Sequence, residues 1–120
     1  MPLAAGTVFR GQAVSGAGAQ ADAAVMTPPY PDLPLPRADR PIFVFRHARP
    51  ETVAYFPQAA GIVFAHGGVL SHACVVAREM GLPCVTGLGD AFYTQIAACT
   101  DAPVRLSIDG SNGEVRIISC

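Results

Sequence analysis

His72 is the residue of this sequence best placed to do chemistry. It follows Ser71 at the start of a predicted helix over residues 71–80, and Gly67 and Gly68 precede it in a loop. An imidazole at a helix N-terminus lies beside unpaired N–H groups and the positive end of the helix dipole, which disfavours its protonated form. The same N–H groups would stabilise an anion attached to the ring. The sequence therefore predicts a neutral, nucleophilic histidine suited to carrying a phosphoryl group.

The helix that would position His72 has signals at both ends. Ser71 is a favoured N-cap residue. Gly81 can adopt the left-handed conformation that ends a helix, and Pro83 prevents its continuation. The spacing i, i+3, i+4, i+7 predicts a buried face made of Ala73, Val76, Ala77 and Met80.

Two other roles for His72 follow from the same residues. It could be a capping or hydrogen-bonded polar residue without chemistry. It could also join His66 and Cys74 around a metal, but this spacing fits no common zinc pattern. His72 and Cys74 would also point about 200° apart around a helix. We therefore expect no metal site.

The composition limits the number of domains and the kinds of ligand that we expect. The chain has 120 residues, of which 51% are hydrophobic and 14% charged, so we expect a single domain over residues 1–120. Its formal net charge of −1 argues against nucleic acid as a partner. It contains no lysine, which most nucleotide-phosphate sites use.

The cysteines and the apolar runs bear on the compartment. The four cysteines, Cys74, Cys84, Cys99 and Cys120, show no CxxC spacing and read as reduced thiols. No secretory signal is visible at the N-terminus, and no apolar run is long enough to span a membrane. These features predict a cytoplasmic protein that does not bind membranes.

Strands and helices alternate in the predicted element order. Strands are expected over residues 7–14 (broken at Gly11), 23–26, 41–46, 61–65 and 83–86. Helices are expected over residues 50–56, 71–80 and 90–99, the last with Asp90 as N-cap. Residues 104–108 and 114–118 should form a hairpin, and the proline-rich connector 27–41 a surface loop. This order predicts an α/β fold whose sheet is partly parallel.

A longer motif surrounds His72. The segment 67–87 resembles the phosphohistidine signature of phosphoenolpyruvate (PEP)-utilising enzymes: PEP synthase, pyruvate phosphate dikinase, phosphotransferase-system enzyme I and rifampicin phosphotransferase. The resemblance also extends to residues 10–16, to residues 87–91 and to the hairpin over 109–118. The matching residues of the signature itself are Gly67, Gly68, Ser71, His72, Ala77, Arg78, Gly81, Leu82 and Pro83.

This resemblance implies a three-layer β/β/α swivelling phosphohistidine domain. His72 would be the catalytic carrier, with Gly67, Gly68 and Ser71 beside the phosphate. The phosphoryl group would come from ATP on an ATP-grasp nucleotide-binding domain or from PEP on a PEP-binding barrel domain, in the same chain or another. The domain would bind no cofactor itself, Mg²⁺ would enter with those partners, and this phosphotransferase component would not turn over alone.

A second function stays open. Phe64 and Ala48 stand where the family often has hydroxyl residues, one of which can hydrogen-bond the active histidine. The chain could therefore be a non-catalytic interaction module that keeps the fold with an inactive histidine. A carrier requires the His72 ring to be exposed to solvent, whereas an inactive histidine could be buried.

Overall fold

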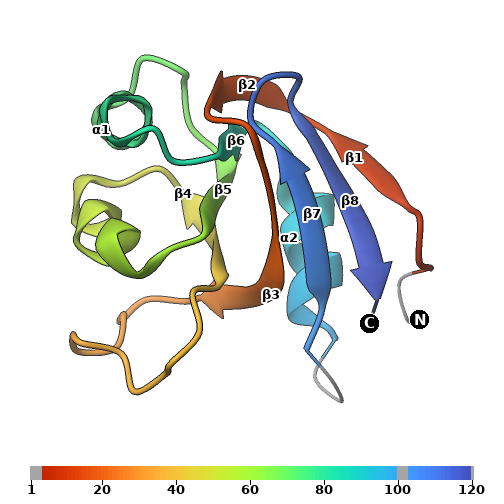
Figure 1. Ribbon diagram of the computed structural model, residues 1–120, viewed down its shortest axis with the longest axis horizontal. Coiled ribbons are helices and arrows are strands. Elements are labelled where there is room, and N and C mark those ends of the chain that lie inside the picture. The colour runs from red at the N-terminus through yellow and green to blue at the C-terminus, as the bar shows by residue number, and fades with distance from the viewer. Residues whose placement is uncertain (1–3, 100–102, 120) are drawn as a thin grey trace.

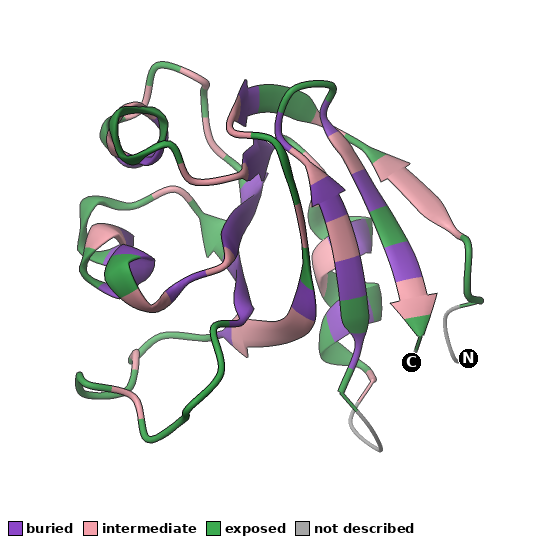
Figure 2. Ribbon diagram, in the orientation of Figure 1, coloured by how far each residue is buried: buried purple, intermediate pink, exposed green. Residues whose placement is uncertain are grey.

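Four parallel strands form the centre of the protein in its computed structural model, which describes residues 4–99 and 103–119 (Figure 1). They are β3 (Gly18–Met26), β4 (Ile42–His47), β5 (Gly61–His66) and β6 (Cys84–Thr86). The apolar runs of β4 and β5 are buried on both faces, as expected for parallel strands covered on two sides (Figure 2). The predicted parallel sheet is confirmed.

A second, antiparallel layer shares β3 with the first. The first half of β3 pairs with β7 (Arg105–Asp109), which is followed by β8 (Glu114–Ser119) and β1 (Val8–Arg10). At the other end of the strand order, β2 (Gln12–Ser15) pairs with β6. β1 and β2 are consecutive in the chain yet lie at opposite ends of this order, so the sheet curls back on itself.

Gly11 makes the passage from β1 to β2 feasible. A Cβ at this position would lie 2.3 Å from the carbonyl oxygen of Thr86. The predicted break at Gly11 is therefore confirmed, and its reason is a close approach of two backbones.

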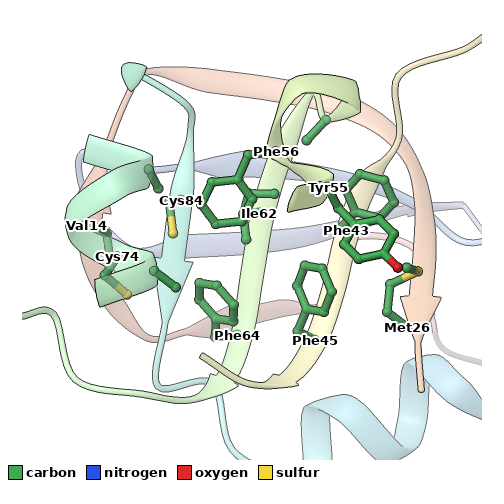
Figure 3. Packing of buried hydrophobic residues seen from close by; sticks show 13 residues of the cluster. Val14, Met26, Phe43, Phe45, Tyr55, Phe56, Ile62, Phe64, Cys74 and Cys84 are labelled. Carbon is green, nitrogen blue, oxygen red and sulfur yellow. The ribbon is translucent and has the colours of Figure 1, made fainter. Parts of the chain in front are cut away.

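Helices cover the outer face of the parallel strands. α1 (His72–Met80) and the 3-10 helix η1 (Pro50–Gln58) pack there over an aromatic cluster in which Phe45 stacks on Phe64 with ring centroids 5.7 Å apart (Figure 3). α2 (Asp90–Ala97) lies on the other face and packs its Phe92 edge-to-face on Phe9 of β1. The layers are antiparallel sheet, parallel sheet and helices, which confirms the β/β/α fold.

Several local predictions need correction. The helix after Pro50 is a 3-10 helix that runs to Gln58, and the strand predicted over 23–26 begins earlier, at Gly18. The N-cap of α2 is Gly89 and not Asp90, and its φ of +90° is one that glycine adopts readily. α2 ends at Ala97. In α1 the buried residues are Ala73, Cys74 and Ala77, whereas Met80 is exposed.

The connector 27–41 contains no helix or strand, as predicted, but it is tied to the body of the protein. Tyr30 and Leu35 pack against the aromatic cluster. The Leu35 N–H donates to Gln58 Oε1 at 3.1 Å, and the Tyr55 hydroxyl donates to the Pro31 carbonyl. The predicted surface loop therefore packs some of its side chains against the core.

Cys74 and Cys84 are buried free thiols, while Cys120 lies outside the described residues. None of the helices in residues 4–99 and 103–119 is long and apolar enough to cross a bilayer.

Candidate functional site

His72 is the first residue of α1 and its side chain is exposed. Ser71 is the N-cap, with an extended backbone (φ −63°, ψ 155°), and its carbonyl accepts the first helical hydrogen bond from Val75 N–H at 2.9 Å. Within the described part of the chain, the N–H groups from His72 to Cys74 donate to no backbone carbonyl. The ring of His72 therefore lies in solvent at the start of a helix whose first N–H groups are available.

Ser71 does not cap these N–H groups with its side chain, as its residue type had led us to expect. The helix has no side-chain cap, and Ser71 Oγ is buried without a hydrogen-bond partner of ordinary length. The hydroxyl is turned inward, so the N–H groups of the first turn stay open for an anion.

Gly67 holds the loop before α1 in a conformation that only glycine adopts easily. Its φ is +154°, and a Cβ would lie 2.5 Å from Ala48 Cβ. The hydroxyl of buried Thr86 on β6 donates to the Gly67 carbonyl at 2.9 Å. Gly68, in contrast, has open space where a Cβ would be, while its carbonyl accepts from Ser71 N–H at 3.0 Å.

We expect Gly67→Ala to lower the free energy of unfolding by about 3 kcal/mol, through backbone strain and the collision with Ala48. Gly68→Ala is the matched control and should stay within about 0.5 kcal/mol of the parent, because nothing obstructs its Cβ. Urea unfolding followed by circular dichroism measures both. Adding Ala48→Gly to Gly67→Ala should restore only the part of the unfolding free energy that the collision with Ala48 removes. Equal stabilities of Gly67→Ala and Gly68→Ala would contradict this account of the loop.

Arg78 fastens the same loop from the far end of α1. Its Nε donates to the Val14 carbonyl at 3.3 Å and one terminal nitrogen donates to the Val69 carbonyl at 3.2 Å. The guanidinium thus ties α1 to β2 and to the residues just before His72.

A polar network that the sequence reading missed lies at the carboxyl ends of β4 and β5. Asp90 Oδ1 lies 2.7 Å from His66 Nε2 and accepts a hydrogen bond from Arg46 Nε at 3.1 Å. The His66 ring stacks on the His47 ring with centroids 5.4 Å apart. Both histidines are exposed, so the network lies on the surface of the protein. Their positions at the ends of adjacent parallel strands could have indicated the contact.

The pKa of Asp90 is lowered from its ordinary value, first by the hydrogen bond with His66 and then by that with Arg46. A lowered carboxyl pKa stabilises the fold above the pKa of the unfolded state, and this stabilisation is lost as the pH falls through the folded pKa. We therefore expect Asp90→Asn to melt at a lower temperature than the parent at neutral pH, with the gap closing in acid. Glu79→Gln, on the exposed side of α1, is the control, and a gap independent of pH would contradict the prediction.

Two buried thiols, Cys74 of α1 and Cys84 of β6, lie on the inner side of this helix (Figure 3). A hydrogen bond from the Cys84 thiol, with smaller contributions from Ser71, Thr86 and Arg78, lowers the pKa of Cys74 to about 6. The same contact raises the pKa of Cys84. The two thiols therefore shift each other's pKa in opposite directions, on the inner side of the helix that begins with His72.

The predicted site residues thus lie in one loop and helix start. Gly67, Gly68, Ser71 and His72 lie within six residues of the chain, and Thr86 and Arg78 hold this segment in place. His66 and His72 do not form a metal site with Cys74. Among the described residues no group of three or more His, Cys, Asp or Glu side chains could hold a metal ion.

Comparison with known proteins identifies the family. The sequence model described as "PEP-utilising enzyme, mobile domain" matches residues 38–113. The chain belongs to this family. The match spans β4 to the turn after β7, so it includes the glycine loop, α1 and the network around Asp90.

Two curated relatives show what this mobile domain is part of elsewhere. A probable phosphoenolpyruvate synthase of Methanothermobacter thermautotrophicus is 41% identical over 55% of this chain and 9% of its own length. Pyruvate, phosphate dikinase of Clostridium symbiosum is 31% identical over 94% of this chain and 14% of its own length. The chain therefore spans about a tenth of these relatives, which carry much more sequence than this mobile domain.

A solved structure supports the fold independently of the family model. The N-terminal domain of Enzyme 1-Nitrogen superposes with a TM-score of 0.55 at 24% identity, over 70% of this chain and 34% of that one. The swivelling-domain architecture implied by the sequence resemblance is confirmed.

Proposed function

We propose that this mobile domain carries a phosphoryl group on His72 between two sites on partner domains. The observation that supports the proposal is the exposed imidazole at the first position of α1, beside N–H groups that no side chain caps. An arrangement that only capped the helix would use the Ser71 hydroxyl for that purpose, and this hydroxyl is turned away.

The transfer needs little from the protein beyond position and charge. A ring nitrogen of His72 uses its lone pair to form a P–N bond. The bond from phosphorus to the donor oxygen breaks, and that oxygen keeps the electron pair. The acceptor oxygen or water later attacks the same phosphorus, and the P–N electrons return to the ring. In both steps the first-turn N–H groups face the phosphoryl oxygens and stabilise their negative charge.

The donor is ATP on an ATP-grasp domain or PEP on a barrel domain, in this protein or in a separate one. In this proposal Mg²⁺ enters with those partners, as the family resemblance implies. The rigid attachment of the loop by Thr86 and Arg78 suits a domain that moves as a body and presents one residue to both sites.

One observation favours the alternative of a non-catalytic module. Phe64 is fully buried and stacks on Phe45, and Ala48 packs toward Gly67, so neither position offers a hydroxyl to orient the His72 ring. The exposure of His72 favours the carrier, and the experiment below separates the two.

The chain should be mixed with the ATP-grasp and PEP-binding domains of its own source, with MgATP or PEP, and followed by intact mass at neutral pH. The carrier gains one phosphoryl group that is lost in acid and survives in alkali, as expected of a P–N bond. A chain that stays unmodified with both donors, while its partners transfer the group to another phosphohistidine domain, is a non-catalytic module.

A further inference from the structure

A cleft of about 280 Å³ lies at the carboxyl ends of β3 and β4, apart from the loop that carries His72. Three segments line it: the residues after β3, the end of β4 with Arg49 shortly after it, and α2. Their polar and aromatic members are Thr27, Tyr30, Arg46, His47, Arg49 and Tyr93. Crevices outside the carboxyl ends of parallel strands are the usual ligand sites of α/β sheets.

Positive groups dominate one wall. Arg46 Nε donates a hydrogen bond to Asp90, and the terminal nitrogens of Arg46 have no partner among the described residues. Arg49 forms no ion pair within the same residues. The exposed His47 ring lies between the two arginines in sequence. Two acidic groups act on residues of the lining: Asp90 bonds to Arg46 and His66, and the charge of Glu51 acts on Tyr30. Two guanidinium groups on one short segment suit an oxyanion bound by more than one hydrogen bond.

The other walls are aromatic and already fixed. The Tyr30 ring packs edge-to-face on Phe45 and Tyr55, with centroids 5.5 Å and 5.8 Å away. The Tyr93 hydroxyl donates to the Met26 carbonyl at 3.1 Å and lies 3.1 Å from Thr27 Oγ1. A ligand would therefore meet preformed flat surfaces rather than having to order them.

We propose that this cleft binds a small organic anion, a phosphate or a carboxylate attached to a planar or apolar body. The oxyanion lies against Arg46 and Arg49, and the body lies between Tyr30 and Tyr93. The site is separate from phosphoryl transfer, since neither His72 nor the glycine loop contributes to its lining. The volume of about 280 Å³ is just below the roughly 300–1,000 Å³ of small-molecule pockets and suits a small ligand.

The test is a titration of the full chain, followed by ¹H–¹⁵N spectra, with phenyl phosphate, benzoate and neutral benzyl alcohol in turn. We expect saturable shifts at residues 27–30, 46–49 and 93–97 with one or both anions and none with the alcohol. The anion that binds with the lower Kd shows whether phosphate or carboxylate is the recognised group. Arg49→Gln should weaken binding about tenfold or more, since it removes a charged hydrogen-bond donor.

Arg116→Gln, on exposed β8, is the matched control and should bind as the parent does, as should His72→Gln. Equal affinity in Arg49→Gln and Arg116→Gln would overturn the proposal. So would the absence of saturable shifts with either anion, or shifts confined to the start of α1. Binding of an acidic peptide from a partner domain without binding of either small anion would overturn it as well. None of these results bears on phosphorylation, which His72→Gln alone removes.

Discussion

His72→Gln is expected to take up no phosphoryl group under conditions in which the parent chain is fully modified. Glutamine keeps a polar side chain of similar reach, so the helix start and the loop should be undisturbed. It has no ring nitrogen to form the P–N bond, so the acid-labile adduct should fall to background. Intact mass and the loss of phosphoryl transfer to the acceptor domain measure the effect.

The other two histidines make this test specific. His47 and His66 are also exposed, and they lie on the strand ends next to the loop. His47→Gln and His66→Gln should retain most of the adduct, because neither residue lies at a helix start. A non-enzymatic donor such as phosphoramidate reaches any open imidazole, so it provides a positive control for the folded His72→Gln chain. If the enzymatic adduct persists in His72→Gln and vanishes in His66→Gln, the phosphoryl carrier is His66, beside Asp90, and not His72.

Gly110→Ala should lower the free energy of unfolding by about 3 kcal/mol or more, a large share of the stability of a small domain. Gly110 follows β7 and lies against β2, and a Cβ there would be 1.7 Å from the Ser15 carbonyl oxygen and 3.0 Å from Cys84 N. Both neighbours are backbone atoms, so relief requires the two sheets to separate. Urea or thermal unfolding of the purified variant measures the loss, and failure to express a folded chain is the extreme form of the same result.

Gly18→Ala is the comparison for this effect. Gly18 begins β3, and its Cβ would meet nothing closer than the Ile108 carbonyl oxygen at 3.5 Å, an ordinary contact. We expect no loss there, and a gain of about 0.5 kcal/mol is reasonable because alanine loses less conformational freedom on folding. If both variants unfold at the same urea concentration, the contact between hairpin and β2 is not the one described.

The sequence determined the elements and the place of the candidate site, because both depend on short-range physics. Apolar runs and their period define β4, β5 and α1. Gly81 caps α1 in the left-handed conformation, with φ +69°, as its position after the last helical residue predicts. The glycine pair, Ser71 and His72 lie together because they are neighbours in the chain, and the signature around them placed the chain in its family.

Only the tertiary structure decided which distant groups meet. The sequence predicts a hairpin turn over residues 109–113. Position 110 requires glycine, however, because the Ser15 carbonyl oxygen on another strand lies where a Cβ would be. The Thr86 bond to Gly67, the Arg78 bonds to Val14 and Val69, and the Asp90 contact with His66 join segments that a local pattern does not relate. The inward orientation of the Ser71 hydroxyl is also decided by tertiary structure, because the groups around it are Cys74 and the strands beneath α1. Residue type states what a side chain can donate or accept, whereas packing decides which partner is within reach.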